Sequence, residues 1–174
     1  MPRLFVAVWP PDEVLDLIEA LPRPDVEGLR WTTRDQWHVT LRFFGAVELE
    51  DASAALQSMS APATSGVLGP ETGRFGKRVL HVPVAGLDVV AKAVVPATKR
   101  VGKPPEPRPF KGHLTLARAR DRRRGVDLRP LIGTPVAAEW PVNEVCLVES
   151  HLSSKGANYS VVESVSLTEP RTLE

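Results

Sequence analysis

Apolar and polar residues alternate over several short segments, a pattern that predicts β-strands. Elsewhere apolar residues recur every three or four positions, which predicts amphipathic helices. The expected strands are 3–8, 36–44, a short strand near 67, 79–84, 113–119, 142–149 and 159–167. The expected helices are 12–21, 48–59 and 87–101, with a short helix at 127–132 and a glycine-containing turn at 73–77. Pro96 is expected to kink or stop the third helix.

This order of elements predicts an α+β domain whose antiparallel sheet is divided between two lobes. We expect one domain over residues 1–168 and a disordered tail at 169–174. Each half of the chain contributes one strand with the same short motif, which suggests an internal duplication.

The repeated motif is His-x-Thr-Leu, present as His38-Val39-Thr40-Leu41 and as His113-Leu114-Thr115-Leu116. Successive side chains of a strand point to opposite faces, so the His and Thr of each copy share one face. The apolar residues of each copy share the other face, which we expect to be buried. Two such strands facing each other would hold two imidazoles and two hydroxyls around a phosphate.

Two imidazoles on opposite sides of a phosphoryl group can act as a general acid and a general base, because histidine titrates near neutral pH. The Thr40 and Thr115 hydroxyls can donate hydrogen bonds to non-bridging oxygens. Arg118 can supply a fixed positive charge, but on an unbroken strand its side chain points away from His113 and needs a bulge to turn inward. The four histidines show no local metal-ligand spacing, so we expect no metal and no cofactor. A 2′,3′-cyclic phosphate is an activated ester that suits such chemistry.

Charge is distributed unevenly along the 174 residues, although the net charge is only +1. Residues 99–124 hold ten basic and two acidic side chains, a net charge of +8, and include the second motif. Such a segment favours attraction of a polyanion. Arg122, Arg123 and Arg124 are candidate RNA contacts, with a solvated basic loop as the alternative.

The hydrophobic fraction of 43% and charged fraction of 25% are typical of a soluble globular protein. A single cysteine, Cys146, excludes an intrachain disulfide. The chain has no signal-peptide pattern and no apolar run of about 18 residues, so we expect a cytoplasmic protein that does not contact membranes.

Most of the remaining candidate residues are expected to be structural. The aromatic residues expected mainly in the core are Trp31, Trp37, Phe43, Phe44 and Trp140. Phe44 is the better candidate for stacking on a base, because it shares the strand parity of His38 and Thr40. His81 and His151 are expected to be surface or hydrogen-bonded residues.

Four stretches of the sequence resemble the 2H phosphoesterase superfamily, and in particular its RNA 2′,3′-cyclic phosphodiesterase branch, historically called 2′-5′ RNA ligase. These stretches are RLFVAVWPPDEV, RWTTRDQWHVTLRFFG, FKGHLTLAR and LVESHLSSKGANYSVVESVSL. The resemblance implies a bilobal α+β fold of two pseudo-symmetric antiparallel sheets around a central groove, with outer helices. It implies hydrolysis of an RNA 2′,3′-cyclic phosphodiester to a 2′-phosphomonoester.

Residue by residue, the resemblance implies that His38 donates a proton to the leaving O3′ and that His113 activates water. It implies that Thr40, Thr115 and Arg118 contact the phosphate. The expected partner is RNA or an oligonucleotide ending in a 2′,3′-cyclic phosphate, and the expected state is a monomer. The alternatives are a 2′-5′ RNA ligase, a phosphodiesterase acting on a small cyclic nucleotide, and a non-catalytic nucleotide-binding module.

Overall fold

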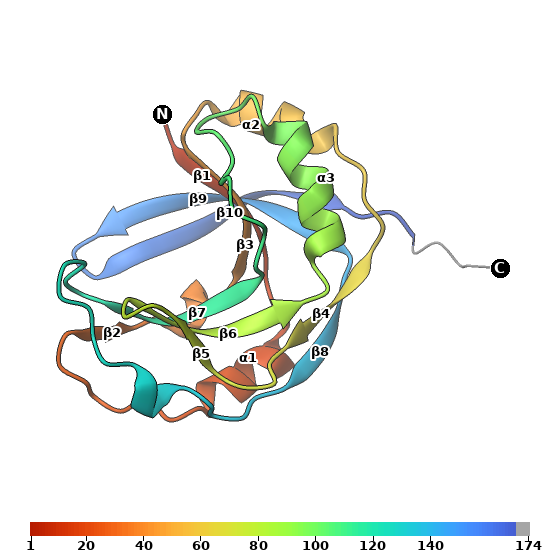
Figure 1. Cartoon of the computed structure of the whole chain (residues 1–174). Helices are drawn as coiled ribbons and strands as arrows, with labels where there is room; N and C mark the ends of the chain where they lie inside the picture. The colour runs from red at the N-terminus through yellow and green to blue at the C-terminus, as the bar shows by residue number, and fades with distance from the viewer. Residues whose placement is uncertain (170–174) are drawn as a thin grey trace.

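The computed structural model describes residues 1–169 and shows one strongly curled antiparallel sheet with helices outside it (Figure 1). The helices are α1 (Asp12–Glu19), α2 (Leu49–Gln57) and α3 (Asp88–Thr98), and short 3₁₀ helices lie at Arg34–Gln36 and Arg129–Leu131. The strands are β1 (Arg3–Val8), β2 (Leu29–Trp31), β3 (Val39–Ala46), β4 (Thr64–Leu68), β5 (Gly73–Phe75), β6 (Val79–Ala85), β7 (His113–Ala119), β8 (Ala138–Val142), β9 (Glu144–Ser153) and β10 (Gly156–Ser166). The predicted α+β class is therefore confirmed.

The sheet consists of two half-sheets joined at a single point. Its strand order is β10-β9-β1-β3-β7-β6-β4-β8, with β2 paired to β7 and β5 paired to β6. The two motif strands, β3 and β7, meet through one residue pair, Val39 with Leu114. The expected two lobes are present, and the motif strands, which were expected to face each other, are neighbours at the junction of one curled sheet.

Apolar residues of the motif strands anchor this junction in the core. Val39 and Leu114 are fully buried, and both belong to the main hydrophobic cluster together with the buried faces of α2 and α3. Fully burying such a side chain stabilises the fold by about 1.5–3 kcal/mol. Burial of this pair therefore fixes the opposite face of the sheet, which carries His38, Thr40, His113 and Thr115.

Several elements differ from the sequence-based expectation. The first three residues of the turn predicted at 73–77 form strand β5. The chain turns only at Gly76, whose φ is +56°. Pro96 lies inside α3 and does not end it. The strands β2 and β8 were not predicted, because three to five residues at a sheet edge give little alternation. Of the tail expected at 169–174, residues 170–174 lie outside the described part of the chain.

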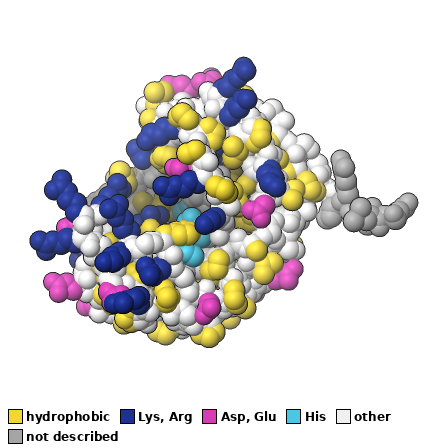
Figure 2. Space-filling model, viewed as in Figure 1, with side chains coloured by type: hydrophobic (Ala, Val, Ile, Leu, Met, Phe, Trp, Pro, Cys, Tyr) yellow, Lys and Arg dark blue, Asp and Glu magenta, His cyan; other side chains and the backbone are white. Residues whose placement is uncertain are grey.

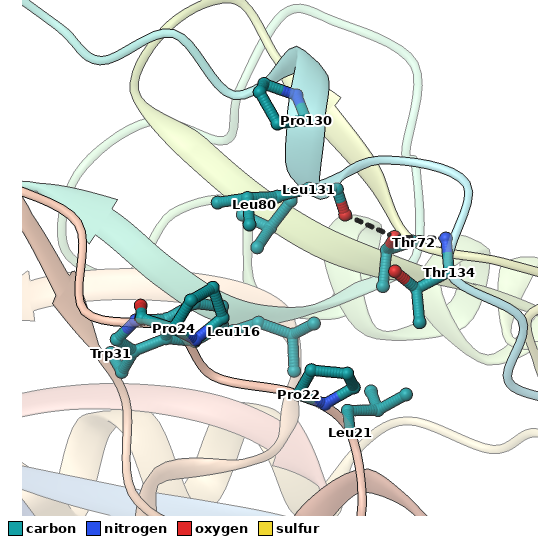
Figure 3. Close-up of a pocket in the computed structure, with 10 residues that line it drawn as sticks. All are labelled: Leu21, Pro22, Pro24, Trp31, Thr72, Leu80, Leu116, Pro130, Leu131 and Thr134. Atoms are coloured by element: carbon teal, nitrogen blue, oxygen red, sulfur yellow. Dashed lines mark hydrogen bonds between the residues drawn. The ribbon is translucent and has the colours of Figure 1, made fainter.

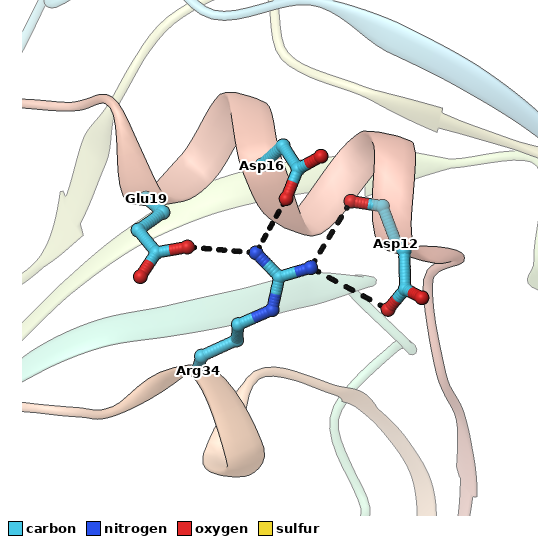
Figure 4. Close-up of polar contacts among 4 residues, drawn as sticks. All are labelled: Asp12, Asp16, Glu19 and Arg34. Atoms are coloured by element: carbon cyan, nitrogen blue, oxygen red, sulfur yellow. Dashed lines mark hydrogen bonds and ion pairs between the residues drawn. The ribbon is translucent and has the colours of Figure 1, made fainter.

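A cluster of ion pairs holds the segment that precedes the first motif (Figure 4). The Arg34 guanidinium, in the 3₁₀ helix before His38, lies 2.6 Å from an Asp16 oxygen and 2.7 Å from a Glu19 oxygen. It also lies 3.4 Å from an Asp12 oxygen. All three carboxylates belong to α1, so the cluster ties this helix to the segment that leads into β3.

The tip of the β9–β10 hairpin closes one end of the curl. Arg30 of β2 donates a hydrogen bond of 2.6 Å to the Lys155 carbonyl, and the Gln36 side chain donates one of 2.7 Å to the Ala157 carbonyl. Residues more than 120 positions apart in the sequence thus connect the two half-sheets a second time.

Candidate active site

The junction between β3 and β7 brings the two motifs together. Because Val39 and Leu114 pair in antiparallel direction, His38 lies toward Thr115 and Thr40 lies toward His113 on the opposite face. Figure 2 shows the histidine side chains in a hollow of the surface, with lysines and arginines around it. The two imidazoles and two hydroxyls expected from the sequence therefore lie on one face, around a pseudo-twofold centre.

A bulge lies at the last residue of the motif in each strand. In the β6–β7 ladder, Thr115 pairs with His81 but Ala117 pairs with Leu80, so Leu116 is the extra residue. The Thr32 amide and hydroxyl donate hydrogen bonds of 2.8 Å to the Leu116 carbonyl, which supplies a partner at the irregular position.

The bulge in β7 turns Arg118 onto the face of His113 and Thr115. Arg118 is exposed, whereas Leu116 and Ala117 are both buried, so the alternation resumes one residue out of phase. Its positive charge lowers the pKa values of both His38 and His113, which places the guanidinium near both rings. The bulge that Arg118 needs in order to turn inward is therefore present.

The matching bulge in β3 corrects the prediction for Phe44. In the β1–β3 ladder, Thr40 pairs with Ala7 and Arg42 pairs with Val6, so Leu41 is the extra residue. Phe44 is consequently turned into the core, where it is 0% exposed, and cannot stack on a base. Phe43 takes the outward position instead, on the face of Thr40, and is 38% exposed.

His38 lies in an aromatic cage that the sequence analysis did not predict. Its ring centroid is 5.0 Å from those of Phe5, Trp9 and Tyr159. Phe5 and Trp9 come from the start of the chain and Tyr159 comes from β10, so only the long-range order β10-β9-β1-β3 brings them together. The sequence features that could have indicated this cage are the two aromatic residues in RLFVAVW and the single tyrosine, Tyr159.

The surroundings of His113 are different. Its ring lies 4.8 Å from the Phe75 ring and 5.6 Å from the His81 ring. His81 is only 7% exposed, and its Nδ1 has no hydrogen-bond partner among the described residues. His81 is therefore neither a surface residue nor fully hydrogen-bonded, contrary to expectation, whereas His151 is exposed and lies 3.8 Å from a Glu149 oxygen.

Backbone carbonyls define the tautomer of both motif histidines. His38 Nδ1 lies 2.8 Å from the Gln36 oxygen, and His113 Nδ1 lies 2.8 Å from the Lys111 oxygen. Because a carbonyl oxygen only accepts, each Nδ1 carries a hydrogen, and each Nε2 is left to exchange protons. His38 Nε2 lies 3.0 Å from the Thr40 hydroxyl, which can donate to it when the ring is neutral.

Gly112 allows the chain to enter β7 at this point. A Cβ atom there would lie 2.3 Å from the Val84 carbonyl oxygen. The absence of a side chain therefore lets β6 and β7 approach closely just before His113.

Burial lowers the pKa values of both motif histidines. Desolvation is the main cause for His38, whose pKa falls to about 4, with smaller contributions from the charges of Arg118 and His113. Desolvation and Arg118 also lower the pKa of His113. The hydrogen bonds to Gln36 and Lys111 oppose these effects. Both rings are therefore neutral at pH 7 when the hollow holds no anion.

A separate cavity of about 200 Å³ is lined by neither motif histidine, by neither motif threonine and not by Arg118 (Figure 3). Thr72 and Thr134 contribute its polar edge, and the Thr72 hydroxyl donates to the Leu131 carbonyl at 2.8 Å. The cavity is otherwise lined by Leu21, Pro22, Pro24, Trp31, Leu80, Leu116, Pro130 and Leu131. With no titratable side chain, it offers no acid or base.

Residues 1–169 hold no group of three or more His, Cys, Asp or Glu side chains arranged to bind a metal ion. None of their helices has the length and apolar character that a membrane crossing requires.

Comparison with known proteins gives one curated relative at substantial identity. The RNA 2′,3′-cyclic phosphodiesterase of Thermus thermophilus is 32% identical over an alignment 184 positions long, gaps included, which covers 95% of this chain and 90% of that protein. No family model matches the chain.

Solved structures share the fold over nearly the whole chain. TT0787 of Thermus thermophilus matches with a TM-score of 0.75 at 29% identity, covering 97% of this chain and 100% of that one. A structure described as a phosphoesterase matches with a TM-score of 0.76 at 25% identity, covering 97% and 99%. Escherichia coli LigT in its apo form matches with a TM-score of 0.75 at 24% identity, covering 97% and 98%, and supports the fold alone.

A curled antiparallel sheet that carries two His-x-Thr segments side by side defines a two-histidine phosphoesterase. The chain belongs to the 2H phosphoesterase superfamily, together with its cyclic phosphodiesterase relative, as the sequence resemblance implied. It is accordingly a phosphodiesterase enzyme of this family.

Proposed function

We propose that this enzyme hydrolyses the 2′,3′-cyclic phosphodiester at the end of an RNA chain to a 2′-phosphomonoester, using two histidines and no metal ion. The observation that carries the proposal is the Val39–Leu114 pair, beside which both histidines, both threonines and Arg118 share one face. The relative from Thermus thermophilus, named an RNA 2′,3′-cyclic phosphodiesterase, supports the choice of substrate.

In this proposal the cyclic phosphate lies between the two imidazoles. The hydroxyls of Thr40 and Thr115 donate hydrogen bonds to its non-bridging oxygens. Arg118 stabilises the negative charge that develops on these oxygens in the transition state. These groups come from both half-sheets, so the phosphate occupies the junction itself.

Two coupled proton transfers complete the reaction. His113 Nε2 takes a proton from a water molecule as the water oxygen forms a bond to phosphorus. The bond from phosphorus to O3′ breaks, and His38 Nε2 gives its proton to O3′. The products are a 2′-phosphate and a free 3′-hydroxyl, and exchange with solvent returns the proton from His113 to His38.

The substrate itself helps to charge His38. Burial keeps the pKa of His38 at about 4 in the free enzyme. A bound phosphate adds a negative charge beside the ring and offsets the positive charge of Arg118. Both effects raise the pKa of His38. The three aromatic rings around His38 also favour its cationic form through cation–π attraction, by about 0.5–2 kcal/mol.

The test is to incubate the protein with an oligoribonucleotide ending in a 2′,3′-cyclic phosphate, with EDTA present, and to identify the product by mass spectrometry and ³¹P NMR. We expect addition of one water and a terminal 2′-phosphate, at a rate that EDTA does not change.

Three outcomes would contradict the proposal. A 3′-phosphate product would mean that O2′ leaves, so the assigned breakage of the bond to O3′ would be wrong. Inhibition by EDTA that a divalent cation reverses would require a metal. No hydrolysis of the cyclic ester would remove the assigned reaction.

A further inference from the structure

A second cluster of positive charge adjoins His113. It lies where the turn between β5 and β6 meets the turn that follows β7. We call this cluster the basic pocket; it is lined by Phe75, Gly76, Lys77, Arg78, Arg122, Arg123, Arg124 and Gly125. Its volume is about 240 Å³.

Backbone contacts build the pocket from two segments far apart in sequence. The Val126 amide donates to the Lys77 carbonyl at 2.8 Å, and the Ala119 amide donates to the Arg78 carbonyl at 2.8 Å. Gly125 has a φ of +65°, and a Cβ atom there would lie 2.7 Å from Lys77 Cβ. The two turns are therefore held in close contact by their main chains, and the position of the pocket is defined.

Little negative charge balances the cations that line the pocket. Of the five cations that line the pocket, all within the described residues, only Arg124 has a carboxylate partner, an Asp121 oxygen at 3.9 Å. Nearby Asp127 is held by Arg129 at 2.9 Å. Five exposed cations gathered around one hollow repel one another, and an anion bound there would relieve this repulsion. Guanidinium groups favour phosphate because their hydrogen-bond geometry matches it.

Phe75 links the pocket to the histidines. Its ring lines the pocket and lies 4.8 Å from the His113 ring, and the side chain is 37% exposed. A ligand with one phosphate at the histidines therefore passes Phe75 before its next phosphate reaches the arginines. An exposed aromatic ring on this path offers a surface for base stacking.

We infer that the basic pocket binds a backbone phosphate of the nucleotides that precede the terminal cyclic phosphate, so that the enzyme selects an oligoribonucleotide over a cyclic mononucleotide. This inference rests on the proposed function. It assigns Arg122, Arg123 and Arg124 a defined role together with Lys77 and Arg78.

The experiment compares kcat/KM for three substrates: a 2′,3′-cyclic mononucleotide, the same molecule with a 5′-phosphate, and a tetranucleotide ending in a 2′,3′-cyclic phosphate. The variant is R122Q/R123Q/R124Q. The control is K92Q/K99Q/R100Q, which removes the same charge from α3 and the residues directly after it, on the other side of the molecule in Figure 1.

We expect the wild-type enzyme to prefer the tetranucleotide over the mononucleotide by at least about tenfold, mainly through KM, since one phosphate contact is a charge-assisted interaction. The variant should lose most of this preference, and the control should keep it. The dependence of log(kcat/KM) on log salt for the tetranucleotide should also become shallower by about 0.7 or more, the value for one phosphate contact on a single strand.

The outcomes separate the two proposals. Failure to hydrolyse any of the three substrates overturns the proposed function itself. Hydrolysis without a preference for the tetranucleotide, or an equal loss of preference in variant and control, overturns the basic pocket alone. The 5′-phosphate is the next phosphate of the chain, so adding it to the cyclic mononucleotide should raise kcat/KM in the wild-type enzyme and in the control but not in the variant. An equal gain in the variant would overturn the inference.

Discussion

The two halves of the site carry the same four-residue motif with a bulge at its last residue, yet they surround their histidines differently. His38 lies against three aromatic rings, whereas His113 lies beside Phe75 and the buried His81. The residue five positions after each histidine also differs, being Phe43 in the first half and Arg118 in the second. A repeated motif thus supplies matched geometry, while the neighbouring strands supply different electrostatics.

This difference bears on which histidine is the acid. Burial lowers the pKa of His38 to about 4, which by itself disfavours its protonated form. The aromatic cage and a bound phosphate both favour that form. The proposed role of His38 as proton donor therefore depends on the bound substrate, whereas His113 is neutral in the free enzyme, as its proposed role as a base requires.

Removal of either histidine should give the largest effect. We expect His38→Ala and His113→Ala each to lower kcat by about 10²–10⁴, the contribution of one general acid or base. His151→Ala, at an exposed position near Glu149, is the matched control and should keep wild-type activity. Rates are measured on a cyclic phosphate substrate, with thermal denaturation to verify folding. Activity near wild type in either folded alanine variant would exclude the two-histidine mechanism.

Arg118 and Phe43 occupy equivalent positions, so their substitution tests the asymmetry directly. Arg118→Gln should lower kcat/KM by about 10²-fold, because it removes the fixed positive charge near both histidines. Phe43→Gln should change kcat/KM by less than about threefold, since it removes no charge. Equal losses in the two variants would mean that the halves contribute equally, contrary to this account.

His81 in the second half corresponds to Ala7 in the first, because these residues pair with Thr115 and Thr40. Burial lowers the pKa of His81 to about 4, below the usual value near 6.5. The unfolded chain therefore binds more protons, and stability is lost as the pH falls from about 6.5 to 4.

The free energy of unfolding in urea is measured at pH 7.0 and at pH 4.5. Its decrease between these two pH values should be about 2 kcal/mol smaller in His81→Leu than in the wild-type protein. His151→Leu, at an exposed histidine, should keep the wild-type pH dependence. An unchanged dependence in His81→Leu would show that the ring is not held in its neutral form.

Changes in the aromatic cage around His38 should have the smallest effect, which is a shift in the pH dependence of the rate. Both histidine pKa values are lowered in the free enzyme, so kcat/KM should be bell-shaped with an optimum below pH 6.5. The two apparent pKa values of this profile describe the coupled pair of histidines, so neither value is assigned to one residue. The kcat profile should lie at higher pH, because the bound phosphate raises both values.

Tyr159→Leu removes one ring of the cage and should shift the profile by about half a pH unit toward acid, given the strength of a cation–π contact. Tyr159→Phe keeps the ring and should not shift it. A shift of equal size in both variants would assign the effect to the hydroxyl.

The comparison also shows what the sequence could predict. Alternation placed β1 and β7 correctly and put each His and Thr on a common face, because these relations are local. The positions of Phe44 and Arg118 could not be derived, because a bulge reverses strand parity and depends on the partner strand. The environments of His38 and His81 depend on strand order and register, which bring together residues from opposite ends of the chain.

The single pair Val39–Leu114 has a consequence for how such an enzyme can diverge. Directly opposed residues of antiparallel strands keep their Cα atoms about 4.5–5.5 Å apart, whatever their side chains. The spacing between His38 and His113, the proposed acid and base, is thus set by main-chain pairing. Substitution of core side chains therefore leaves the distance between the proposed proton donor and acceptor unchanged.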